Sequence, residues 1–496
     1  MASLRLPMKS SSGLRGLPAA FTAAGYTLPA VKAMIRTQRH LSSRAEDLAV
    51  FERRVAGDTP AELLCRLFLL NLPLEPAELE RALPGTDLRV LEDGGLVELR
   101  AGKVVPKLRL VPHGDIYLAS DKLGSGDQHG HVTGVNNPAI LLADLAIRTP
   151  VALGLDLGSG GGIQALLMSR HCDRVIATDL NPRALEMTLL NAEMNGVTNI
   201  ECRLGSLFEP VEGIAFDLIL SNPPYVISPE STLLYRDSGR EADAFCRELI
   251  GTAPSHLAPG GFAQALVSWA EHRGEAWGDI LSSWVEGSAC DALFLHYSTE
   301  DPLTHAARWT RPPSVAEVAA YEGRMDSWVA YCADLGIESI GFGSVTLRGR
   351  AEAGWRRADE LRAGQGEAGA HIRRVFESQD LLLGLKHPRD LLDATLSPAP
   401  GLRLEQVMTI GSDGAWESLD TKLLMSVGLG FQGSLDYGLI QLLQNFDGTN
   451  TVRQAGARAA RQLGLPVGEL ESYRSDVLTA VRRLLELGFF ELRPGS

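Results

Sequence analysis

Two kinds of apolar pattern alternate through the middle of the chain. Short runs rich in Val, Ile and Leu occur at 153–157, 174–178 and 216–220, and the first is followed by apolar residues at helical spacing. Buried strands that alternate with helices are typical of a largely parallel sheet covered by helices. Further strands are predicted at 262–269, 289–297 and 337–348, with helices between 302 and 335. The pattern predicts an α/β domain over residues 121–350.

The residues before this domain follow a different pattern, in which short helices precede a hairpin. Three segments at helical spacing and two alternating segments are found at 60–71, 75–83, 88–93, 96–100 and 104–111. This is the order of a winged-helix module, predicted for residues 42–120. The segment in the recognition position, RVLEDGG, is acidic, which favours docking of a substrate protein over reading of DNA. A purely structural packing role is the alternative.

The N-terminal residues 1–41 are predicted to be a basic arm with a helix. Residues 1–45 hold seven Lys or Arg and no Asp or Glu, a composition that also occurs in organelle transit peptides. An arm on a bacterial cytosolic protein is favoured, because residues 17–35 have the apolar spacing of a folded helix.

The C-terminal part is predicted to consist of a linker and a second module. Residues 351–395 are charged and irregular, which is typical of a linker with a few helical turns. In residues 396–496, helical spacing at 439–446, 452–463 and 469–487 precedes a terminal LGFFEL strand. This order is similar to that of winged-helix or peptide-chaperone-like modules. Two such modules beside a central domain suggest, by analogy of architecture, a macromolecular or carrier-borne substrate.

The first strand of the central domain ends in a glycine-rich turn. Its glycines fall at Gly158, Gly160 and Gly162, and Ile163 occupies the position where a G-x-G-x-x-G dinucleotide turn has its last glycine. Glycine lets the backbone approach a ligand where a Cβ atom would clash. The turn therefore predicts a nucleotide-cofactor pocket of another type.

An acidic residue ends the next strand, where doubly wound folds have a ribose-binding acid. Asp179 follows Asp156 by 23 residues. A carboxylate at this place can accept hydrogen bonds from both ribose hydroxyls. The alternative is that Asp179 only caps the helix that begins at Pro182, although Asn181 can cap it with Pro182 in the first helical position.

A polar motif, Asn222-Pro223-Pro224-Tyr225, follows the strand at 216–220, at the carboxyl end where open α/β sheets bind ligands. Two prolines fix φ and remove two N–H donors, which leaves a stiff loop rich in carbonyl acceptors. The Asn222 side-chain oxygen and the Pro223 carbonyl can accept both protons of a planar amino group, on which Tyr225 can stack. The loop is predicted to align the nitrogen for attack on a methyl group. An isolated Asn-Pro-Pro-Tyr motif is a simple proline turn after a strand about as often as it is a binding loop.

These motifs together resemble one known family. Asp-x-Gly-x-Gly-x-Gly is similar to motif I of the class I S-adenosylmethionine (SAM) methyltransferases, and Asn-Pro-Pro-Tyr resembles the HemK-like branch, the protein-glutamine N5 methyltransferases. Further matches are Tyr235–Arg240 and the turn Leu257–Gly261. The resemblance covers about residues 120–350. It implies a Rossmann-like sheet of seven strands with the last inserted antiparallel, flanked here by two smaller α+β modules.

The resemblance also implies SAM as the cofactor and assigns roles to the matching residues. Asp156 is expected near the methionine amino end, and the glycine turn beneath the cofactor. Ser206 stands where the family has the Asp that holds the adenine amino group, so a weaker hydrogen bond is expected there. The cofactor-binding residues are predicted to be Asp156, Gly158, Ser159, Gly160, Gly162, Asp179, Leu180, Ser206, Leu207 and Asn222, and the catalytic residues Asn222, Pro223, Pro224 and Tyr225.

The segment 124–131, before the central domain, is predicted to be a flexible lid over the pocket. It contains His129 and His131, whose spacing suggests a metal at first sight. No further ligand set accompanies them, so both are predicted to be solvated loop residues.

Composition narrows the possible partners. The net charge of −14 repels phosphate backbones and disfavours a nucleic-acid substrate. No apolar run is long enough to span a bilayer, so no membrane partner is expected. Six cysteines without a C-x-x-C pair predict neither a zinc site nor a disulfide framework and fit a reducing cytosol. A cytoplasmic protein without a metal is predicted, and its oligomeric state stays open.

The sequence thus predicts SAM-dependent N-methylation of a planar nitrogen, with a protein glutamine as the favoured acceptor. An exocyclic amine of RNA or DNA is one alternative, and a small-molecule amine or amide is another. A SAM-binding assembly protein is the non-enzyme alternative, and the intact Asn-Pro-Pro-Tyr motif argues against it.

Overall fold

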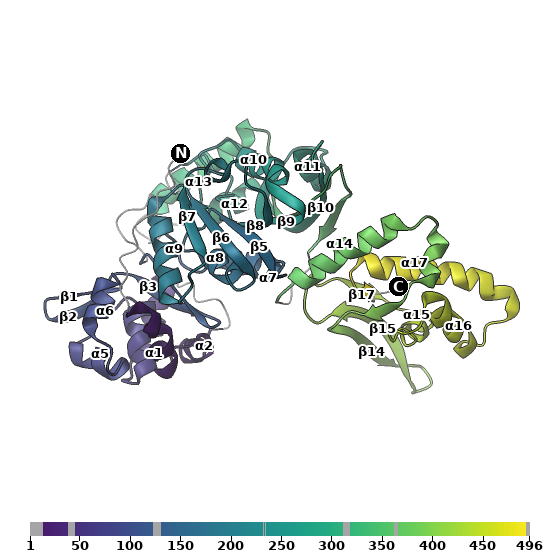
Figure 1. Cartoon of the computed structure of the whole chain (residues 1–496), viewed down its shortest axis with the longest axis horizontal. Coiled ribbons are helices and arrows are strands. Elements are labelled where there is room, and N and C mark those ends of the chain that lie inside the picture. Colours follow the sequence, from purple (N-terminus) through teal and green to yellow (C-terminus); the bar gives the residue numbers. More distant parts are fainter. Residues whose placement is uncertain are drawn as a thin grey trace. The chain divides into compact units, whose positions relative to one another are not determined.

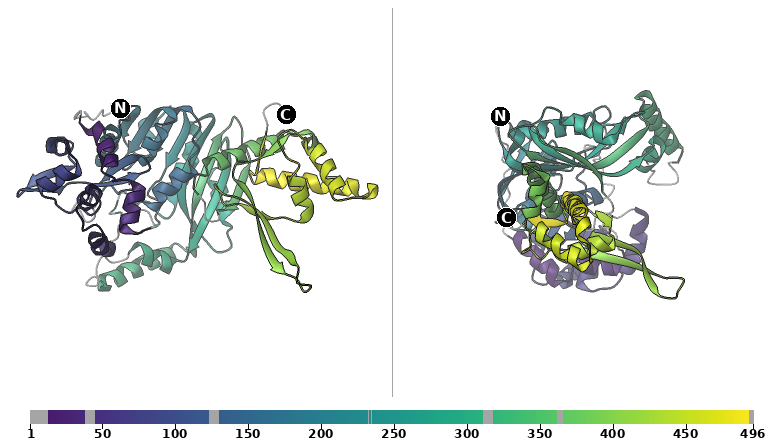
Figure 2. Two further views of the ribbon diagram at one scale, coloured as in Figure 1. Left: turned by 90° about the horizontal axis from the view of Figure 1, so that it is seen from below. Right: turned by 90° about the vertical axis from the view of Figure 1, so that its right-hand side faces the viewer.

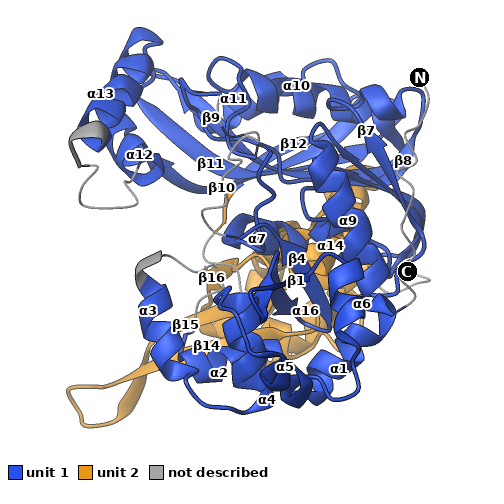
Figure 3. Cartoon of the chain, turned by 90° about the vertical axis from the view of Figure 1, so that its left-hand side faces the viewer, with its two compact units in different colours: residues 1–143, 149–359 blue, residues 144–148, 360–496 orange. Residues whose placement is uncertain are grey.

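The computed structural model of the chain contains two compact units, coloured separately in Figure 3. The first unit holds Met1–Ala143 and Thr149–Asp359, and the second holds Asp144–Arg148 and Glu360–Ser496. The residues described by the structure are 13–37, 45–122, 130–231, 233, 235–310, 318–361 and 366–492.

An eight-stranded sheet forms the centre of the first unit (Figure 1), in the order β12-β10-β11-β9-β8-β5-β6-β7. Its strands are β5 (Val151–Leu157), β6 (Cys172–Asp179), β7 (Ile200–Leu204), β8 (Phe216–Ser221), β9 (Leu257–Glu271), β10 (Cys290–Glu300), β11 (Ser339–Gly349) and β12 (Arg356–Glu360). Strands β5 to β9 pair in parallel, whereas β11 runs antiparallel between β9 and β10. The sheet confirms the predicted class I methyltransferase fold, with β12 as an additional edge strand.

The chain reverses its direction across the sheet at β5 and β8. β5 leads to β6 and β7 on one side, and β8 leads to β9 on the other. Leu157 and Ser221 are paired in register, so the carboxyl ends of the two strands are level. Ligands bind at such reversal points in open α/β sheets. The fold therefore brings the glycine turn after β5 next to Asn222 after β8.

Helices cover this sheet and complete its core. They are α7 (Asn137–Leu145), α8 (Ile163–Met168), α9 (Pro182–Met194), α10 (Ala244–Thr252), α11 (Trp277–Trp284), α12 (Pro302–Trp309) and α13 (Val318–Asp334). α8 and α9 contact β6, and α10 and α11 contact β9. Phe216, Trp269, Phe294 and Val345 are fully buried between helices and sheet. Burial of such large side chains supplies most of the stabilisation of this layer.

The N-terminal elements of the first unit share another hydrophobic core. They are α1 (Leu17–Ala23), α2 (Leu28–Ile35), α3 (Ala45–Arg54), α4 (Pro60–Leu64), α5 (Pro76–Ala82), α6 (Leu88–Asp93), β1 (Val97–Arg100), β2 (Lys103–Pro106), β3 (Arg109–His113) and β4 (Ile116–Ser120). Phe21 and Val31 are buried in this core with Leu63 and Phe68, and Met187 of α9 completes it. Helices α1 and α2 are part of this folded module, as the apolar spacing of residues 17–35 predicts, so the module begins before the predicted boundary at residue 42.

The predicted strand at 104–111 is divided between two hairpins. β1 pairs with β2, and β3 pairs with β4. Pro106 ends β2, and the next residue, Lys107, donates its N–H to the carbonyl of Leu96. This bond continues the β1–β2 pairing past Pro106, and the second hairpin begins at Arg109.

The second unit combines helices with short sheets. Its elements are α14 (Gly369–Gly384), β13 (Leu396–Pro398), β14 (Leu402–Ile410), β15 (Trp416–Met425), β16 (Gln432–Ser434), α15 (Tyr437–Leu443), α16 (Val452–Gln462), α17 (Leu470–Glu486) and β17 (Phe490–Leu492). β13 pairs with β17, and β14, β15 and β16 form a three-stranded sheet whose long hairpin projects from the unit (Figure 2). Phe446 and Phe490 lie 4.8 Å apart between ring centroids in the core.

The predicted linker at 351–395 is wrong over much of its length. It contains β12 and the 16-residue helix α14, whose buried face includes Ile372, Val375 and Phe376. His371 on the same helix is buried, and its Nε2 lies 2.6 Å from the carbonyl oxygen of Leu487. The buried face of α14 also carries His371, Arg374 and Ser378, and these polar positions interrupt its apolar pattern.

Candidate functional site

The glycine turn after β5 combines open space with close packing. Gly158, Gly160 and Gly162 have φ values of 76°, 53° and 79°, which side chains with a Cβ rarely adopt. A Cβ atom at Gly162 would lie 2.7 Å from the side chain of Thr188, whereas Cβ atoms at Gly158 and Gly160 would meet nothing within 4 Å. Gly162 is thus needed for packing against α9, and the other two leave room for a ligand above the turn.

Asp156 is buried beneath the turn. It is 1% exposed, and its Oδ2 accepts a hydrogen bond of 2.9 Å from the backbone N–H of Ala165. Burial raises the pKa of Asp156 to about 7, and the nearby Asp179 carboxylate adds to the rise. An isolated carboxylate in this place is costly to ionise, so a cation bound nearby would stabilise it.

Asp179 holds the turn from the neighbouring strand. Its Oδ2 accepts a hydrogen bond from Gly160 N at 2.9 Å, and its Oδ1 accepts one from Asn181 N at 2.8 Å. The side chain of Asn181 caps α9 by accepting from Arg183 N at 3.0 Å. Asp179 is therefore not the helix cap, and a carboxylate with two bonds still has capacity for ribose hydroxyls.

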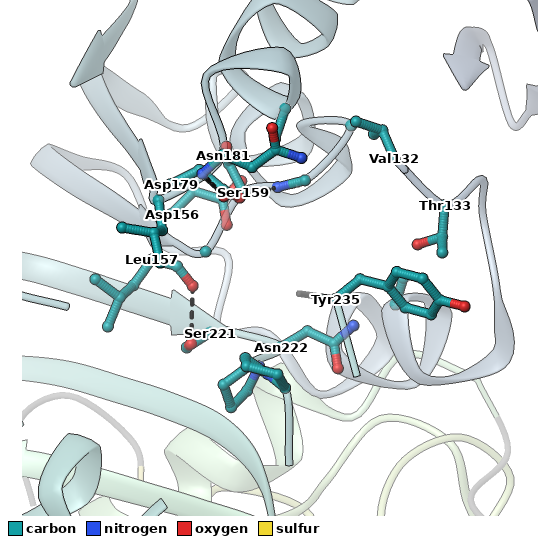
Figure 4. Close-up of a pocket in the computed structure, with 18 of the residues that line it drawn as sticks. Val132, Thr133, Asp156, Leu157, Ser159, Asp179, Asn181, Ser221, Asn222 and Tyr235 are labelled. Atoms are coloured by element: carbon teal, nitrogen blue, oxygen red, sulfur yellow. Dashed lines mark hydrogen bonds between the residues drawn. The ribbon is translucent and has the colours of Figure 1, made fainter. Parts of the chain in front are cut away.

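Asn222 follows β8 with a free acceptor. Its Oδ1 is buried and has no hydrogen-bond partner among the described residues. Ser221, one residue earlier, donates from its hydroxyl to the carbonyl of Leu157 at 2.8 Å and so ties β8 to β5. Figure 4 shows Asn222 and Tyr235 on one side of the cavity, and Asp156, Asp179 and Ser159 on the other. A buried amide oxygen without a donor is a place where a ligand N–H can bind.

A cavity of about 230 Å³ lies between these motifs. Every residue predicted for the cofactor or the acceptor lines it, except Gly162 and Tyr225. Ser206 and Leu207 form its wall beyond β7, and Leu180 lines it although its side chain is largely exposed. The structure thus brings the predicted residues together, and their individual roles stay predictions.

Tyr225 differs from its predicted position. Its ring packs edge-on against Phe342 of β11, with 6.5 Å between centroids, and its carbonyl accepts a hydrogen bond from the Ser268 hydroxyl. Burial raises the pKa of Tyr225 to about 12. The ring thus belongs to the core behind the loop. Tyr235, which does line the cavity, is 45% exposed and, like Phe245, is an aromatic candidate for stacking.

His131, in the cavity wall formed by residues 131–136, also differs from its prediction. The side chain of His131 is only 16% exposed, and its Nδ1 lies 4.0 Å from Asp121 Oδ2. The prediction of a solvated His131 is therefore wrong, because the chain folds back over the glycine turn here. His129 and most of the predicted lid lie outside the described residues.

Several residues that line the cavity lie outside any recognisable sequence motif. Gln164 donates from Nε2 to the carbonyl of Ala139 at 2.7 Å and so joins α8 to α7. Phe245 and Leu249 reach the cavity from α10. Their spacing of four residues, one helical turn, is the only sign in the sequence, and it indicates a buried helix face equally well.

The segment after the motif is held by a buried ion network. Arg236 donates to Asp237 at 2.6 and 2.9 Å and to Glu230 at 2.7 Å, and its guanidinium lies 5.3 Å from the ring centroid of Trp328. Asp237 lines the cavity. The paired charges fix this segment, because a buried arginine without carboxylates would be strongly disfavoured.

The part of the chain that the structure describes contains neither a metal-binding cluster nor a membrane-spanning helix. No group of three or more His, Cys, Asp and Glu side chains is arranged to hold a metal ion there. None of the described helices is long and apolar enough to cross a membrane. All six cysteines are buried and free.

Two sequence families match separate parts of the chain. The methyltransferase small domain matches residues 137–273, and a domain of unknown function (DUF7059) matches residues 23–107. The first contains the glycine turn, Asp179 and the Asn-Pro-Pro-Tyr loop. The second covers most of the N-terminal module.

The relatives found by sequence each match a limited part of the chain. A release factor glutamine methyltransferase from Cereibacter sphaeroides is 39% identical over 135 residues, which cover 24% of this chain and 48% of the relative. One from Aquifex aeolicus is 32% identical over 174 residues, which cover 32% and 59%. The chain spans about half the length of these relatives. Among solved structures, the ribosomal protein L11 methylase from Lactobacillus delbrueckii is 25% identical over 26% of this chain and 57% of that chain, with a TM-score of 0.21.

The strand order and the family match define a class I methyltransferase domain that uses SAM. The open space above Gly158 and Gly160 and the unpartnered Asn222 Oδ1 fit this cofactor and a nitrogen acceptor. The relatives above are named release factor glutamine methyltransferases, which is the branch that the sequence resembles. The resemblance stated from the sequence is thereby confirmed.

Proposed function

We propose that this protein methylates the side-chain amide nitrogen of a glutamine in another protein. The observation that carries the proposal is the buried Oδ1 of Asn222, which faces the cavity without a donor. A primary amide has two N–H groups, so it needs two acceptors in one plane. The carbonyl oxygen of Pro223, to which no described residue donates, would be the second.

The chain's own residues would align the amide. With both protons held by Asn222 and Pro223, the nitrogen cannot rotate, and its lone pair points into the cavity. The two bonds strengthen as positive charge develops on the nitrogen, because hydrogen bonds from charged donors are stronger. Such bonds favour the transition state over the ground state, which is what raises the turnover rate.

The opposite wall would hold the cofactor, which supplies an electrophilic methyl group when bound. Asp179 would accept hydrogen bonds from the ribose hydroxyls, and Asp156 would face the methionine amino group. Ser206 would contact the adenine with one hydroxyl where relatives are expected to use a carboxylate. These roles are the ones predicted from the sequence and the family resemblance, and all three residues line the cavity.

Charge around the catalytic loop favours a protein acceptor over a nucleic acid. The described bases between Phe216 and Ala244 are Arg236 and Arg240, and both are ion-paired, Arg236 with Asp237 and Arg240 with Glu248. Among the described residues of this segment, no base is left unpaired to contact a phosphate. The relatives named release factor glutamine methyltransferases support the same acceptor class.

The test is methylation of a purified peptide-chain release factor with tritium-labelled SAM. We expect label on one glutamine, located by mass spectrometry of the digested product, and no label when that glutamine is replaced by Glu. A cell lysate serves as a second substrate source. Label that disappears after RNase or DNase treatment, but persists after protease treatment, would reject the glutamine acceptor.

A further inference from the structure

A second cavity lies in the second unit, between helices α16 and α17 (Figure 1), which contact each other. Its volume is about 520 Å³. No step of the proposed reaction uses it.

This cavity is a groove between α16 and α17 with an apolar floor. Val452, Val477 and Leu392 are buried at its base. On α16, Gly456 and Ala460 line the groove with small side chains or none. A Cβ atom at Gly456 would lie 3.5 Å from the side chain of Val477, so this glycine lets α16 and α17 pack closely. The apolar residues around it can contact apolar side chains of a peptide.

The rim carries positive charge. Arg453, Arg461 and Arg474 line the groove, and all three are exposed. Arg453 pairs with Asp393, and Arg474 pairs with Glu471. Arg461 has no carboxylate partner among the described residues. A free guanidinium at the edge of an apolar groove favours a carboxylate from outside.

A buried hydroxyl adds a second polar group that lacks a partner. Tyr473 of α17 lines the groove, and its hydroxyl oxygen is buried without a hydrogen bond from any described residue. Burial raises the pKa of this phenol, so it stays neutral and can donate. Because buried hydroxyls are normally bonded, a ligand group is the expected partner.

We propose that this groove docks an acidic, partly apolar peptide segment of the protein that is to be methylated. The recessed apolar floor excludes a double-stranded nucleic acid, whose phosphates would reach only the rim. The role in substrate capture rests on the proposed function, whereas peptide binding itself does not.

The α16 helix offers a matched pair of substitutions. Arg458 lies one turn from Arg461 on the same helix, is exposed and also lacks a carboxylate partner in the described chain, but it does not line the groove. Arg461→Glu and Arg458→Glu therefore change the net charge equally. Only the first places a carboxylate at the groove.

The experiment measures fluorescence anisotropy of a labelled short peptide in which Glu and Leu alternate, added to the full chain. We expect Arg461→Glu to weaken binding by at least ~10-fold and Tyr473→Phe by about 3-fold, with Arg458→Glu within 2-fold of the unchanged protein. Equal weakening by both Arg variants would overturn the proposal, because it would show a bulk charge effect. So would tighter binding of the Lys-Leu counterpart or of a mixed-sequence DNA duplex, or no peptide binding at all.

SAM binding by calorimetry in the same samples separates this proposal from the proposed function. All three variants should bind SAM as the unchanged protein does, which also shows that the chain is folded. Peptide binding without SAM binding would contradict the methyltransferase proposal alone. SAM binding without peptide binding would contradict the groove alone.

Discussion

Replacement of Asn222 by Ala tests the assignment of the acceptor nitrogen. The substitution removes one hydrogen bond from a nitrogen that becomes positively charged, which is worth about 1.5–3 kcal/mol. At about 1.4 kcal/mol for each tenfold change in rate, kcat should fall by roughly 10- to 150-fold. Loss of alignment adds to this, so we expect a fall toward the upper end of that range.

The same substitution should leave SAM affinity within about 2-fold. Asn222 Oδ1 has no partner in the described structure, and the loop is tied to β5 by the Ser221 hydroxyl instead. Asn199→Ala is the control. It removes hydrogen bonds to the carbonyls of Ser169 and Cys172, which should cost about 1 kcal/mol of stability without changing kcat.

The assay is release of labelled product under single-turnover conditions, with calorimetry for SAM. If Asn222→Ala weakened SAM binding as much as it slowed turnover, Asn222 would belong to the cofactor pocket. An unchanged kcat would show that another group holds the nitrogen. Either result would refute the assignment.

Three further predictions concern the cofactor wall. Gly160→Ala and Gly196→Ala should each cost about 1 kcal/mol of stability, because both glycines have positive φ, but only Gly160→Ala should abolish SAM binding in a thermal-shift titration. Since the pKa of Asp156 is raised to about 7, its carboxyl gains a proton as the pH falls; SAM affinity should drop by up to ~10-fold per unit below that pH, and Asp156→Asn should flatten the profile. Ser206→Asp should tighten SAM binding several-fold, and a weaker variant would show that adenine is held elsewhere.

Motifs at strand ends could be predicted from the sequence because their signals are local. The glycines at 158–162 and the prolines at 223 and 224 restrict the backbone by their own chemistry. The strand before each is a short apolar run, so its end is visible in the sequence. The parallel order of β5 and β8 then brings both motifs to one edge.

The positions of the Tyr225 and His131 side chains could not be predicted from local sequence signals. The ring of Tyr225 packs on Phe342, which lies in a strand far along the chain. His131 is covered because the segment before α7 lies over the glycine turn, as the lining of the cavity shows. Both positions depend on long-range packing, for which one sequence contains no pattern.

The second unit was predicted only where one face is buried. Helices α16 and α17 have an apolar face, and their predicted ranges agree with the structure within about two residues. The β14–β15 hairpin was missed because most of its residues are exposed on both faces. Without a buried face there is no alternation of apolar and polar residues to indicate a strand.

In the loop at residues 222–227, the side-chain oxygen of Asn222 and the carbonyl oxygen of Pro223 accept no hydrogen bond from described residues, whereas carbonyl groups further along the loop do. The carbonyl of Tyr225 accepts from the Ser268 hydroxyl, and that of Ile227 is bonded to His305 Nε2 at 2.8 Å. These bonds anchor the loop from behind, so it needs no bond at Asn222 or Pro223 to stay in place. Free acceptors on a rigid loop cost little reorganisation when a ligand binds, and this preorganisation is what alignment of an amide nitrogen requires.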